Sequence, residues 1–250
     1  MKHTMHNPHF KLTITSDHEA SSQAALSLLA DQIHRKPDLL LCLATGSSPT
    51  RLYELLVEKS QARQIPCDRL RALKLDEWNG MSMNDLRTCE WYLQEQVLRP
   101  LGIPAERYQG FQSDAPNPDG ECQRIERWLQ EFGPIDVCIL GLGINGHLGL
   151  NEPASALQAF AHVAKLTSAT LGHSMLQSSG HLPGYGLSLG MADILQSRQI
   201  LLLVHGQHKA EQMRRLMTGP ISCDFPASML WMHPNVCCFC DRAAASLLAE

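Results

Sequence analysis

Short apolar runs alternate with longer amphipathic segments along the 250 residues of this chain, and the alternation restricts the folds available to it. An apolar run of about four to eight residues is typical of a strand buried on both faces, and the segments between the runs are long enough for helices. Repeated βα units of this kind predict a parallel sheet covered by helices. We expect strands at residues 38–44, 70–75, 135–140, 199–204 and 235–240, with an edge strand at 9–15.

The helices are expected at residues 17–35, 49–60, 86–98, 119–132 and 207–217. Asp17 is a suitable N-cap for the first helix, and Ser48 with Pro49 supplies a cap and a first-position proline for the second. No internal repeat and no change in composition marks a domain boundary. The prediction is one α/β domain over residues 1–250, with an open, mostly parallel Rossmann-like sheet and helices on both faces.

The composition favours a folded protein of the cytoplasm. Hydrophobic residues make up 44% and charged residues 18%, an ordinary balance for a globular domain. No apolar stretch approaches the roughly 18 to 20 residues of a membrane span, and the N-terminal residues lack the apolar core of a signal peptide. The formal charge of -4 and the lack of a basic run argue against a nucleic-acid partner, although a local positive pocket could still hold an anion.

The nine cysteines follow neither a metal-binding nor a disulfide pattern. Cys42 and Cys138 lie inside apolar runs, and the three cysteines of NVCCFC have no second cysteine pair to complete a tetrahedral site. The HExxH motif is absent, and no histidine cluster has zinc spacing. We therefore expect free, mostly buried thiols in a reducing compartment and no metal site.

The stretch GLGINGHLGLNEP, at residues 141–153, follows a predicted strand. Each glycine costs about 1 kcal/mol relative to alanine in a helix interior, so this stretch is expected to be a loop that faces a ligand. Three other predicted strands also end in polar residues, at 45–50, 76–78 and 205–209. Because the carboxyl ends of parallel strands share one edge of a sheet, the four segments should converge on one crevice.

The first of these segments, Thr45-Gly46-Ser47-Ser48, stands at the start of a predicted helix, where backbone N–H groups and the helix dipole favour an anion. It lacks the spacings of a P-loop and of GxGxxG, so a plain N-cap turn is the alternative. Lys209 would add the point charge that a phosphate needs, unless it is a solvated lysine of the first helical turn. Together the segments favour a phosphate held by these five residues.

Acid–base candidates occupy two other strand ends. Asp76 and Glu77 are adjacent, so an extended backbone points them in opposite directions and only one can face the crevice. A carboxylate there suits proton transfer at a carbon next to a carbonyl, and the alternative is an aspartate that caps a turn. His147 is the second candidate, and Glu152 could orient it and fix its tautomer. In a loop that also carries Asn145, catalysis is favoured over a structural histidine.

Residues 155–185 have weak periodicity and contain His162, His173 and His181. They predict either a lid over the crevice or a solvated connecting segment.

The segments LATGSSPTRLYELL, KLDEW, GLGINGHLGLNEPAS and GQHKA together resemble the glucosamine-6-phosphate deaminase family, which shares its fold with the 6-phosphogluconolactonases. The third segment is the most specific, because lactonases usually carry an aspartate before the GH and lack NEP. HLGLNEP is therefore similar to the aminosugar branch. LDEW and the later TCE look closest to the galactosamine-6-phosphate deaminase/isomerase branch.

The resemblance implies aldose–ketose isomerisation and deamination of galactosamine 6-phosphate or glucosamine 6-phosphate to the ketose 6-phosphate and ammonia. It assigns the phosphate to residues 46–48 and Lys209, ring opening to His147 with Glu152, and the proton shuttle between carbons 2 and 1 to Asp76. It implies a phosphorylated aminosugar as the partner, a homo-oligomer, and no metal or organic cofactor.

Two features depart from the family pattern. Asn145 stands where several relatives have an aspartate that completes a carboxylate–histidine–carboxylate relay. The arginine that grips the phosphate in well-known relatives has no counterpart at residues 170–180, where His173 is the candidate substitute in the lid. The rival hypotheses are a lactonase-type hydrolase and a non-catalytic sugar-phosphate-sensing module. Glu77 is assigned to structure.

Overall fold

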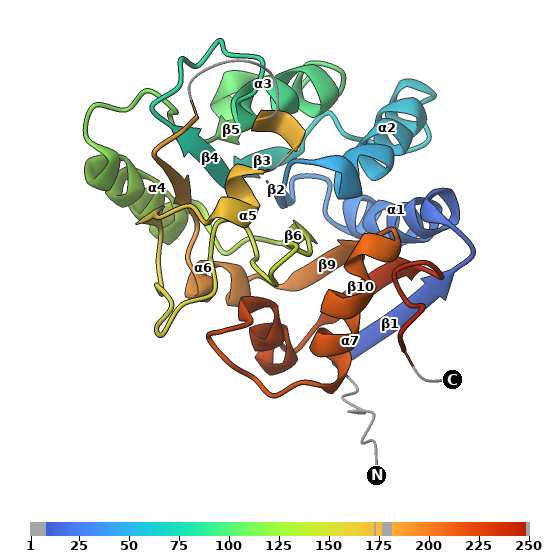
Figure 1. The fold of residues 1–250 in the computed structure, drawn as a ribbon. Helices are drawn as coiled ribbons and strands as arrows, with labels where there is room; N and C mark the ends of the chain where they lie inside the picture. Colours follow the sequence, from blue (N-terminus) through green and yellow to red (C-terminus); the bar gives the residue numbers. More distant parts are fainter. Residues whose placement is uncertain (1–8, 173, 177–181, 249–250) are drawn as a thin grey trace.

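In the part of the chain that the structure describes, seven parallel strands form the central sheet (Figure 1). The computed structural model describes residues 9–172, 174–176 and 182–248. Across the sheet the order is β1 (Phe10–Thr15), β10 (Val236–Asp241), β9 (Gln199–Val204), β6 (Val137–Gly141), β2 (Leu40–Leu43), β3 (Arg71–Lys74) and β5 (Tyr108–Gln109). The predicted α/β fold with a parallel sheet is confirmed, and β1 is an edge strand as expected.

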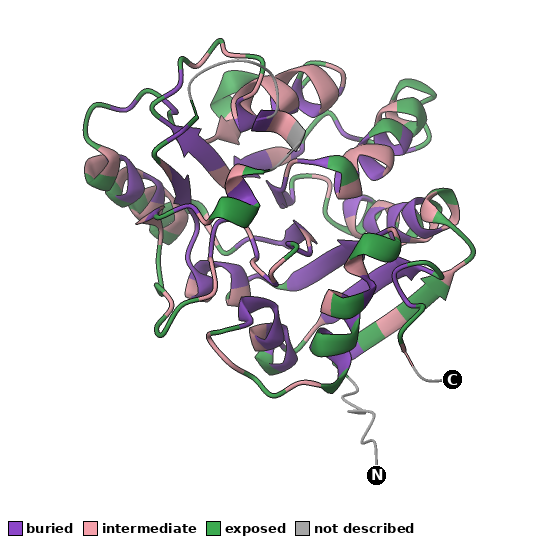
Figure 2. Ribbon diagram, viewed as in Figure 1, coloured by how far each residue is buried: buried purple, intermediate pink, exposed green. Residues whose placement is uncertain are grey.

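The central strands are apolar on both faces of the sheet. Along β9, Ile200, Leu202 and Val204 belong to one core cluster, whereas Leu201 and Leu203 belong to the other. A strand that packs on both sides needs apolar residues at every position, which explains the unbroken runs in the sequence. Figure 2 shows these strands buried and the outward sides of the helices exposed.

Helices cover both faces of the sheet. The helices α1 (His18–Arg35) and α2 (Ser47–Gln61) contribute side chains to the cluster that contains Leu201. On the other face, α4 (Pro118–Phe132) and α7 (Ala210–Thr218) pack into the second cluster, together with α6 (Met191–Leu195) and a 3₁₀ segment at Pro226–Met232.

One of the two predicted helix caps is confirmed and the other is wrong. The Asp17 carboxylate accepts a hydrogen bond from the Ala20 N–H at 2.9 Å and caps α1. Helix α2, however, begins at Ser47, and its N-cap is Gly46 with φ of 99° and no side-chain cap. This left-handed conformation, which glycine adopts without strain, turns the chain from β2 directly into the helix. Ser48 and Pro49 consequently lie inside the first turn.

Two further predicted helices are shorter than expected. The segment predicted at 86–98 becomes α3 only at Cys89–Leu93, where the Thr88 hydroxyl caps it, and continues as a π-helical turn at Gln94–Leu98. The segment predicted at 207–217 begins with a 3₁₀ turn, Gln207–Lys209, before α7. Short 3₁₀ turns also occur at Ala105–Arg107 and Ser174–Leu176.

A second, antiparallel sheet was not predicted. It consists of β4 (Asp76–Asn79), β8 (Tyr185–Ser188) and β7 (His162–Ala164). These strands have three or four residues and mix polar with apolar side chains, so no alternating pattern marks them. The described part of residues 155–185 thus contains β7 and the short helix α5 (Ser168–Leu171).

Within the described residues, none of the helices combines the length and the apolar character that crossing a membrane requires.

Candidate active site

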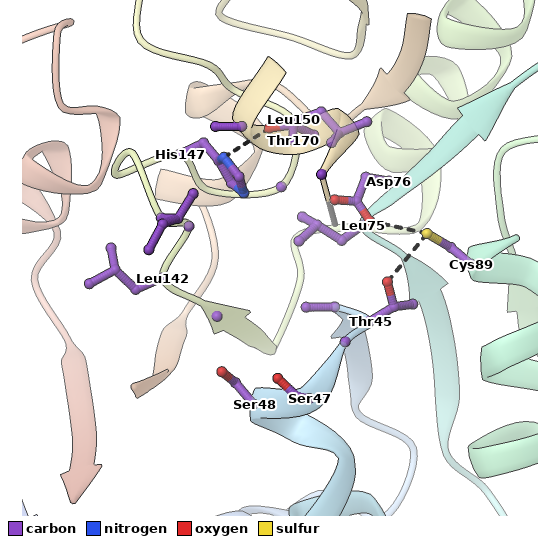
Figure 3. Close-up of a pocket in the computed structure, with 18 of the residues that line it drawn as sticks. Thr45, Ser47, Ser48, Leu75, Asp76, Cys89, Leu142, His147, Leu150 and Thr170 are labelled. Atoms are coloured by element: carbon purple, nitrogen blue, oxygen red, sulfur yellow. Dashed lines mark hydrogen bonds between the residues drawn. The ribbon is translucent and has the colours of Figure 1, made fainter. Parts of the chain in front are cut away.

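A cavity of about 460 Å³ lies at the carboxyl ends of the central strands. Its lining includes all four predicted segments, namely the turn after β2, Asp76 after β3, the glycine-rich loop after β6 and Lys209 after β9. The volume lies within the roughly 300 to 1,000 Å³ typical of small-molecule sites. Figure 3 shows Ser47 and Ser48 at one end, with His147 and Asp76 on facing walls at the other.

The first end of the cavity is built to hold an anion. The chain turns at Gly46, and the N-terminus of α2 meets the cavity with Ser47 and Ser48 in its lining. Of the side chains that the structure describes, none caps this helix, so its first N–H groups and the positive end of its dipole are available to a ligand. Thr45 lines the same wall, and its hydroxyl donates to the Cys89 thiol at 3.3 Å.

Lys209 supplies a cation at this end. It is half-buried, and burial lowers the pKa of its amine to about 8. Among the described residues no acidic side chain forms an ion pair with it. An amine that is partly dehydrated and lacks a counterion gains most from an anionic ligand. His208 lies beside it in the cavity wall.

Asp76 faces the opposite end. Burial and the nearby charge of Glu77 raise the pKa of its carboxyl to about 7, against the weaker lowering effects of Lys74 and of the Cys89 thiol. The thiol donates to Oδ1 of Asp76 at 3.9 Å. A carboxylate with a pKa near neutrality can take and return a proton at physiological pH.

Glu77 points away from the cavity, as expected for the second carboxylate of the pair. Its fully buried side chain accepts from the Lys74 amine at 2.7 Å and from the backbone N–H groups of Trp78, Cys89 and Glu90. These contacts fasten the start of α3 to β4. Asp76 and Cys89 are thereby held on adjoining elements.

The glycine-rich loop carries His147. A Cβ on Gly143 would collide with the His147 ring, so only glycine lets the ring lie over the loop backbone. The Asn145 side-chain oxygen accepts a hydrogen bond from the backbone N–H of His147 at 3.2 Å. The ring's Nδ1 lies 3.6 Å from a carboxylate oxygen of Glu152.

Polar donors surround the Glu152 carboxylate. Oε2 accepts from the Asn145 amide at 2.8 Å and from the Thr167 hydroxyl at 3.2 Å, and Oε1 accepts from the Thr170 hydroxyl. Burial raises the pKa of Glu152, but His147, Thr170 and Asn145 outweigh it and bring the pKa to about 2. Glu152 is therefore a fixed anion beside the imidazole, although it and Asn145 stand behind the cavity wall rather than in it.

The structure thus brings together Thr45, Gly46, Ser47, Ser48, Asp76, Asn145, His147, Glu152 and Lys209. His173 lies outside the described residues. Sequence reasoning gave no role in the site to Cys89, His208, Thr167 or Thr170, although Cys89 and His208 belong to segments that it singled out. The threonines carried only a weak signal, a Thr-x-x-Thr spacing that fits an N-cap at Thr167.

Over the described part of the chain, no group of three or more His, Cys, Asp or Glu side chains is arranged to hold a metal ion.

Comparison with known proteins agrees with this geometry. Residues 16–238 match the model of the family described as glucosamine-6-phosphate isomerases/6-phosphogluconolactonase. The chain is 40% identical to the putative deaminase AgaI of Escherichia coli (strain K12) over 89% of this chain and 88% of that protein. It is 35% identical to glucosamine-6-phosphate deaminase 1 of Bacillus subtilis (strain 168), over 92% and 96% of the two chains.

Among solved structures, a monomeric glucosamine-6-phosphate deaminase superposes with a TM-score of 0.89 at 34% identity, covering 95% of this chain and all of that one. Sequence and fold agree over nearly the full length of both proteins. The chain therefore belongs to the glucosamine-6-phosphate isomerase/6-phosphogluconolactonase family.

Proposed function

We propose that the protein deaminates a 2-amino-2-deoxyhexose 6-phosphate, galactosamine or glucosamine 6-phosphate, to the ketose 6-phosphate and ammonia. One observation carries the proposal. A single cavity has an anion-binding end at residues 46–48 and Lys209, and an acid–base end at Asp76 and His147. A hexose phosphate has the same two ends, with its phosphate on carbon 6 and its reacting atoms at carbons 1 and 2.

The phosphate would accept hydrogen bonds from the N-terminus of α2 and from the hydroxyls of Ser47 and Ser48, with Lys209 as its counterion. Thr45 completes this wall. Burial destabilises the charged form of the Lys209 amine, and a bound phosphate would stabilise it, so binding should favour the charged amine.

Ring opening would fall to His147. With Nδ1 directed at Glu152, Nε2 is left for the substrate. Nε2 takes the proton of the anomeric hydroxyl and returns it to the ring oxygen as the C1–O5 bond breaks and the C1 aldehyde forms. The fixed charge of Glu152 stabilises the intermediate imidazolium, and the Asn145 amide keeps Glu152 in place.

Asp76 would then move a proton from carbon 2 to carbon 1. The aldehyde acidifies the C2–H, and the carboxylate accepts this proton and delivers it to C1. As the C2–N double bond forms, the amine gives up one proton and the aldehyde oxygen gains one, and water hydrolyses the resulting ketose imine to the ketose and ammonia. The aldehyde itself withdraws the electrons, so the scheme uses no metal and no organic cofactor.

The two rivals differ in what they release. A lactonase would hydrolyse an ester with an activated water and has no use for a base that moves a carbon-bound proton. A sensing module would bind the sugar phosphate without turnover. The pKa of about 7 at Asp76 favours the deaminase, because a binding module gains nothing from a buried carboxylate tuned for proton transfer.

The first prediction tests this choice directly. Purified protein should release ammonia from galactosamine 6-phosphate or glucosamine 6-phosphate, measured by a coupled glutamate dehydrogenase assay, and should not release acid from 6-phosphogluconolactone. The epimer with the higher kcat/KM is the substrate. Ammonia from neither aminosugar would overturn the proposal, and acid release from the lactone would support the hydrolase instead.

We further propose that the enzyme works in the cytoplasm, where sugar phosphates are retained, and that it forms a homo-oligomer. The resemblance to the deaminase family supports the second point. The similar solved enzyme is described as monomeric, so the assembly state has to be measured on this chain by light scattering.

A further inference from the structure

The hydroxyl of Thr170 contacts both His147 and Glu152. Its Oγ1 lies 3.4 Å from Nδ1 of the imidazole and donates a hydrogen bond to Oε1 of the carboxylate. Nδ1 lies 3.6 Å from Oε2 of Glu152. Both distances from Nδ1 exceed the 2.7 to 3.2 Å typical of N–H···O bonds, and the shorter one is to the hydroxyl.

A threonine hydroxyl can join an imidazole to a carboxylate, because it has one proton to donate and lone pairs that accept. Ionised Glu152 can only accept, so the proton of Thr170 points to it. The Thr167 hydroxyl lies 3.3 Å from Thr170 Oγ1 as a donor, which leaves one lone pair of Thr170 to accept the Nδ1 proton of His147. This arrangement fixes the tautomer that leaves Nε2 for the substrate.

Thr170 is held in this place by its own helix. It is 2% exposed, and its N–H donates to the Thr167 hydroxyl at 3.3 Å, the cap of α5. Thr167 donates in turn to Oε2 of Glu152. Two of the donors to the carboxylate therefore come from α5 and its N-cap. Both lie within residues 155–185, which the sequence left open between a lid and a connecting segment.

We propose that Thr170 is a positioning residue that joins His147 to Glu152, so that the ring-opening group is the relay His147–Thr170–Glu152 and is complete only when α5 is docked. Figure 3 shows Thr170 reaching His147 on the wall that faces Asp76. This inference rests on the proposed deaminase function. In this proposal α5, which lies in the described part of residues 155–185 and lines the cavity, also takes part in catalysis.

The test separates ring opening from proton transfer at carbon. Thr170→Val keeps the shape of the side chain and removes the hydroxyl, and Thr170→Ser keeps the hydroxyl. We expect Thr170→Val to lower kcat for the cyclic aminosugar phosphate by about 10- to 100-fold, as misplacement of an acid–base group does, with KM nearly unchanged. Thr170→Ser should recover most of the loss.

The second substrate is the 5-deoxy analogue of the ketose 6-phosphate formed from the active epimer, with ammonium in D₂O, because this ketose lacks the hydroxyl that closes the ring. Exchange of its C1 protons, followed by NMR, needs Asp76 but no ring opening. The exchange should stay within about twofold of wild type in Thr170→Val, since Asp76 lies on the facing wall. Thr218→Val, at the exposed end of α7, is the matched control and should leave both rates unchanged.

Equal losses in both reactions would show a merely structural role and overturn the relay, as would a Thr170→Val enzyme with wild-type deamination. In both cases the wild-type enzyme still releases ammonia, so the proposed function stands. If the wild-type protein releases none from either epimer, the function fails and the relay fails with it. Thermal unfolding of each variant checks folding, and Thr170→Ala, which also lacks the hydroxyl, carries the comparison with Thr170→Ser if Thr170→Val does not fold.

Discussion

At the scale of single residues, the site depends on side chains whose proton affinities are changed by where they are buried. Asp76, Glu152 and Lys209 have pKa values of about 7, 2 and 8, each far from the ordinary value of its residue type. Burial acts on all three, and only Glu152 has enough hydrogen-bond donors to overcome it. The sequence identified all three positions, but it could not give these values, which depend on neighbours brought together by folding.

The pKa of Asp76 predicts how activity depends on pH. The carboxylate must be ionised to act as a base, so kcat/KM should fall about tenfold per pH unit below pH 7. Above pH 8 the neutral amine of Lys209 should weaken phosphate binding and raise KM. A pH–rate profile with its maximum between these values is expected, and one that is flat down to pH 5 would exclude Asp76 as the base.

Asp76→Asn should be inactive, because the variant lacks the base. It should also be more stable, because the raised pKa of Asp76 means that its buried charge is unfavourable. A carboxyl whose folded pKa is raised holds its proton more tightly in the native state, so wild-type stability falls as the pH rises from about 4 to about 7. Removing the charge should therefore stabilise the protein by about 1 to 3 kcal/mol at pH 8 and by little at pH 4. Urea unfolding at both pH values measures this, with the exposed Asp31→Asn as the control. Ammonia release by Asp76→Asn at the wild-type rate would contradict the assigned role.

At the scale of elements, patterns of hydrophobicity predicted what packs on the central sheet and failed where short strands pack on one another. The runs that became β2, β6, β9 and β10 were recognised because both of their faces are buried. The strands β4, β7 and β8 are held by pairing with each other and by a small cluster around Trp78, Leu150 and Leu166, so no local pattern marked them. Thr167 and Thr170 were not predicted either, because their partner Glu152 lies 15 or more residues away in the sequence.

The junction of β4 with α3 should depend strongly on Glu77. In Glu77→Gln the fully buried Lys74 loses one of its two carboxylate partners, and a weaker acceptor replaces the anion at the start of α3. Breaking a buried pair costs about 3 to 5 kcal/mol, whereas the exposed pair of Glu95 and Arg99 should contribute at most about 1 kcal/mol. Urea denaturation of Glu77→Gln and Glu95→Gln makes the comparison, and a loss below that of the exposed pair would refute the role given to Glu77.

At the scale of the whole molecule, the predicted convergence of four strand ends was the most productive inference from sequence. It needed only the topological rule for parallel sheets, because the order β9-β6-β2-β3 brings the four exits side by side. Details within the cavity, such as the thiol of Cys89 beside Asp76 or the early start of α2 at Gly46, depend on local geometry that the rule does not contain.

Ligand binding should stabilise the whole fold through the anion end of the cavity. A sugar phosphate at about 100 times its Kd adds about 2.7 kcal/mol, which corresponds to a rise in Tm of about 5 to 10 °C for a chain of this size. The ketose 6-phosphate formed from the epimer that the enzyme deaminates is, as product, a suitable probe in differential scanning fluorimetry. Lys209→Ala should lose most of this shift, and Lys59→Ala, on α2 outside the cavity lining, should keep it. An undiminished shift in Lys209→Ala would remove the lysine from the phosphate site.

The lining of the cavity runs from Ala44 to Lys209 and draws on four strands that are not in chain order across the sheet. When only the first half of the chain has been synthesised, it contains the turn at residues 45–48 and Asp76. It does not yet contain Lys209 or strand β9, which pairs with β6. The nascent protein therefore cannot act on a sugar until most of its length has emerged, and recovery of ammonia release after dilution from denaturant would report completion of the sheet rather than formation of any one part.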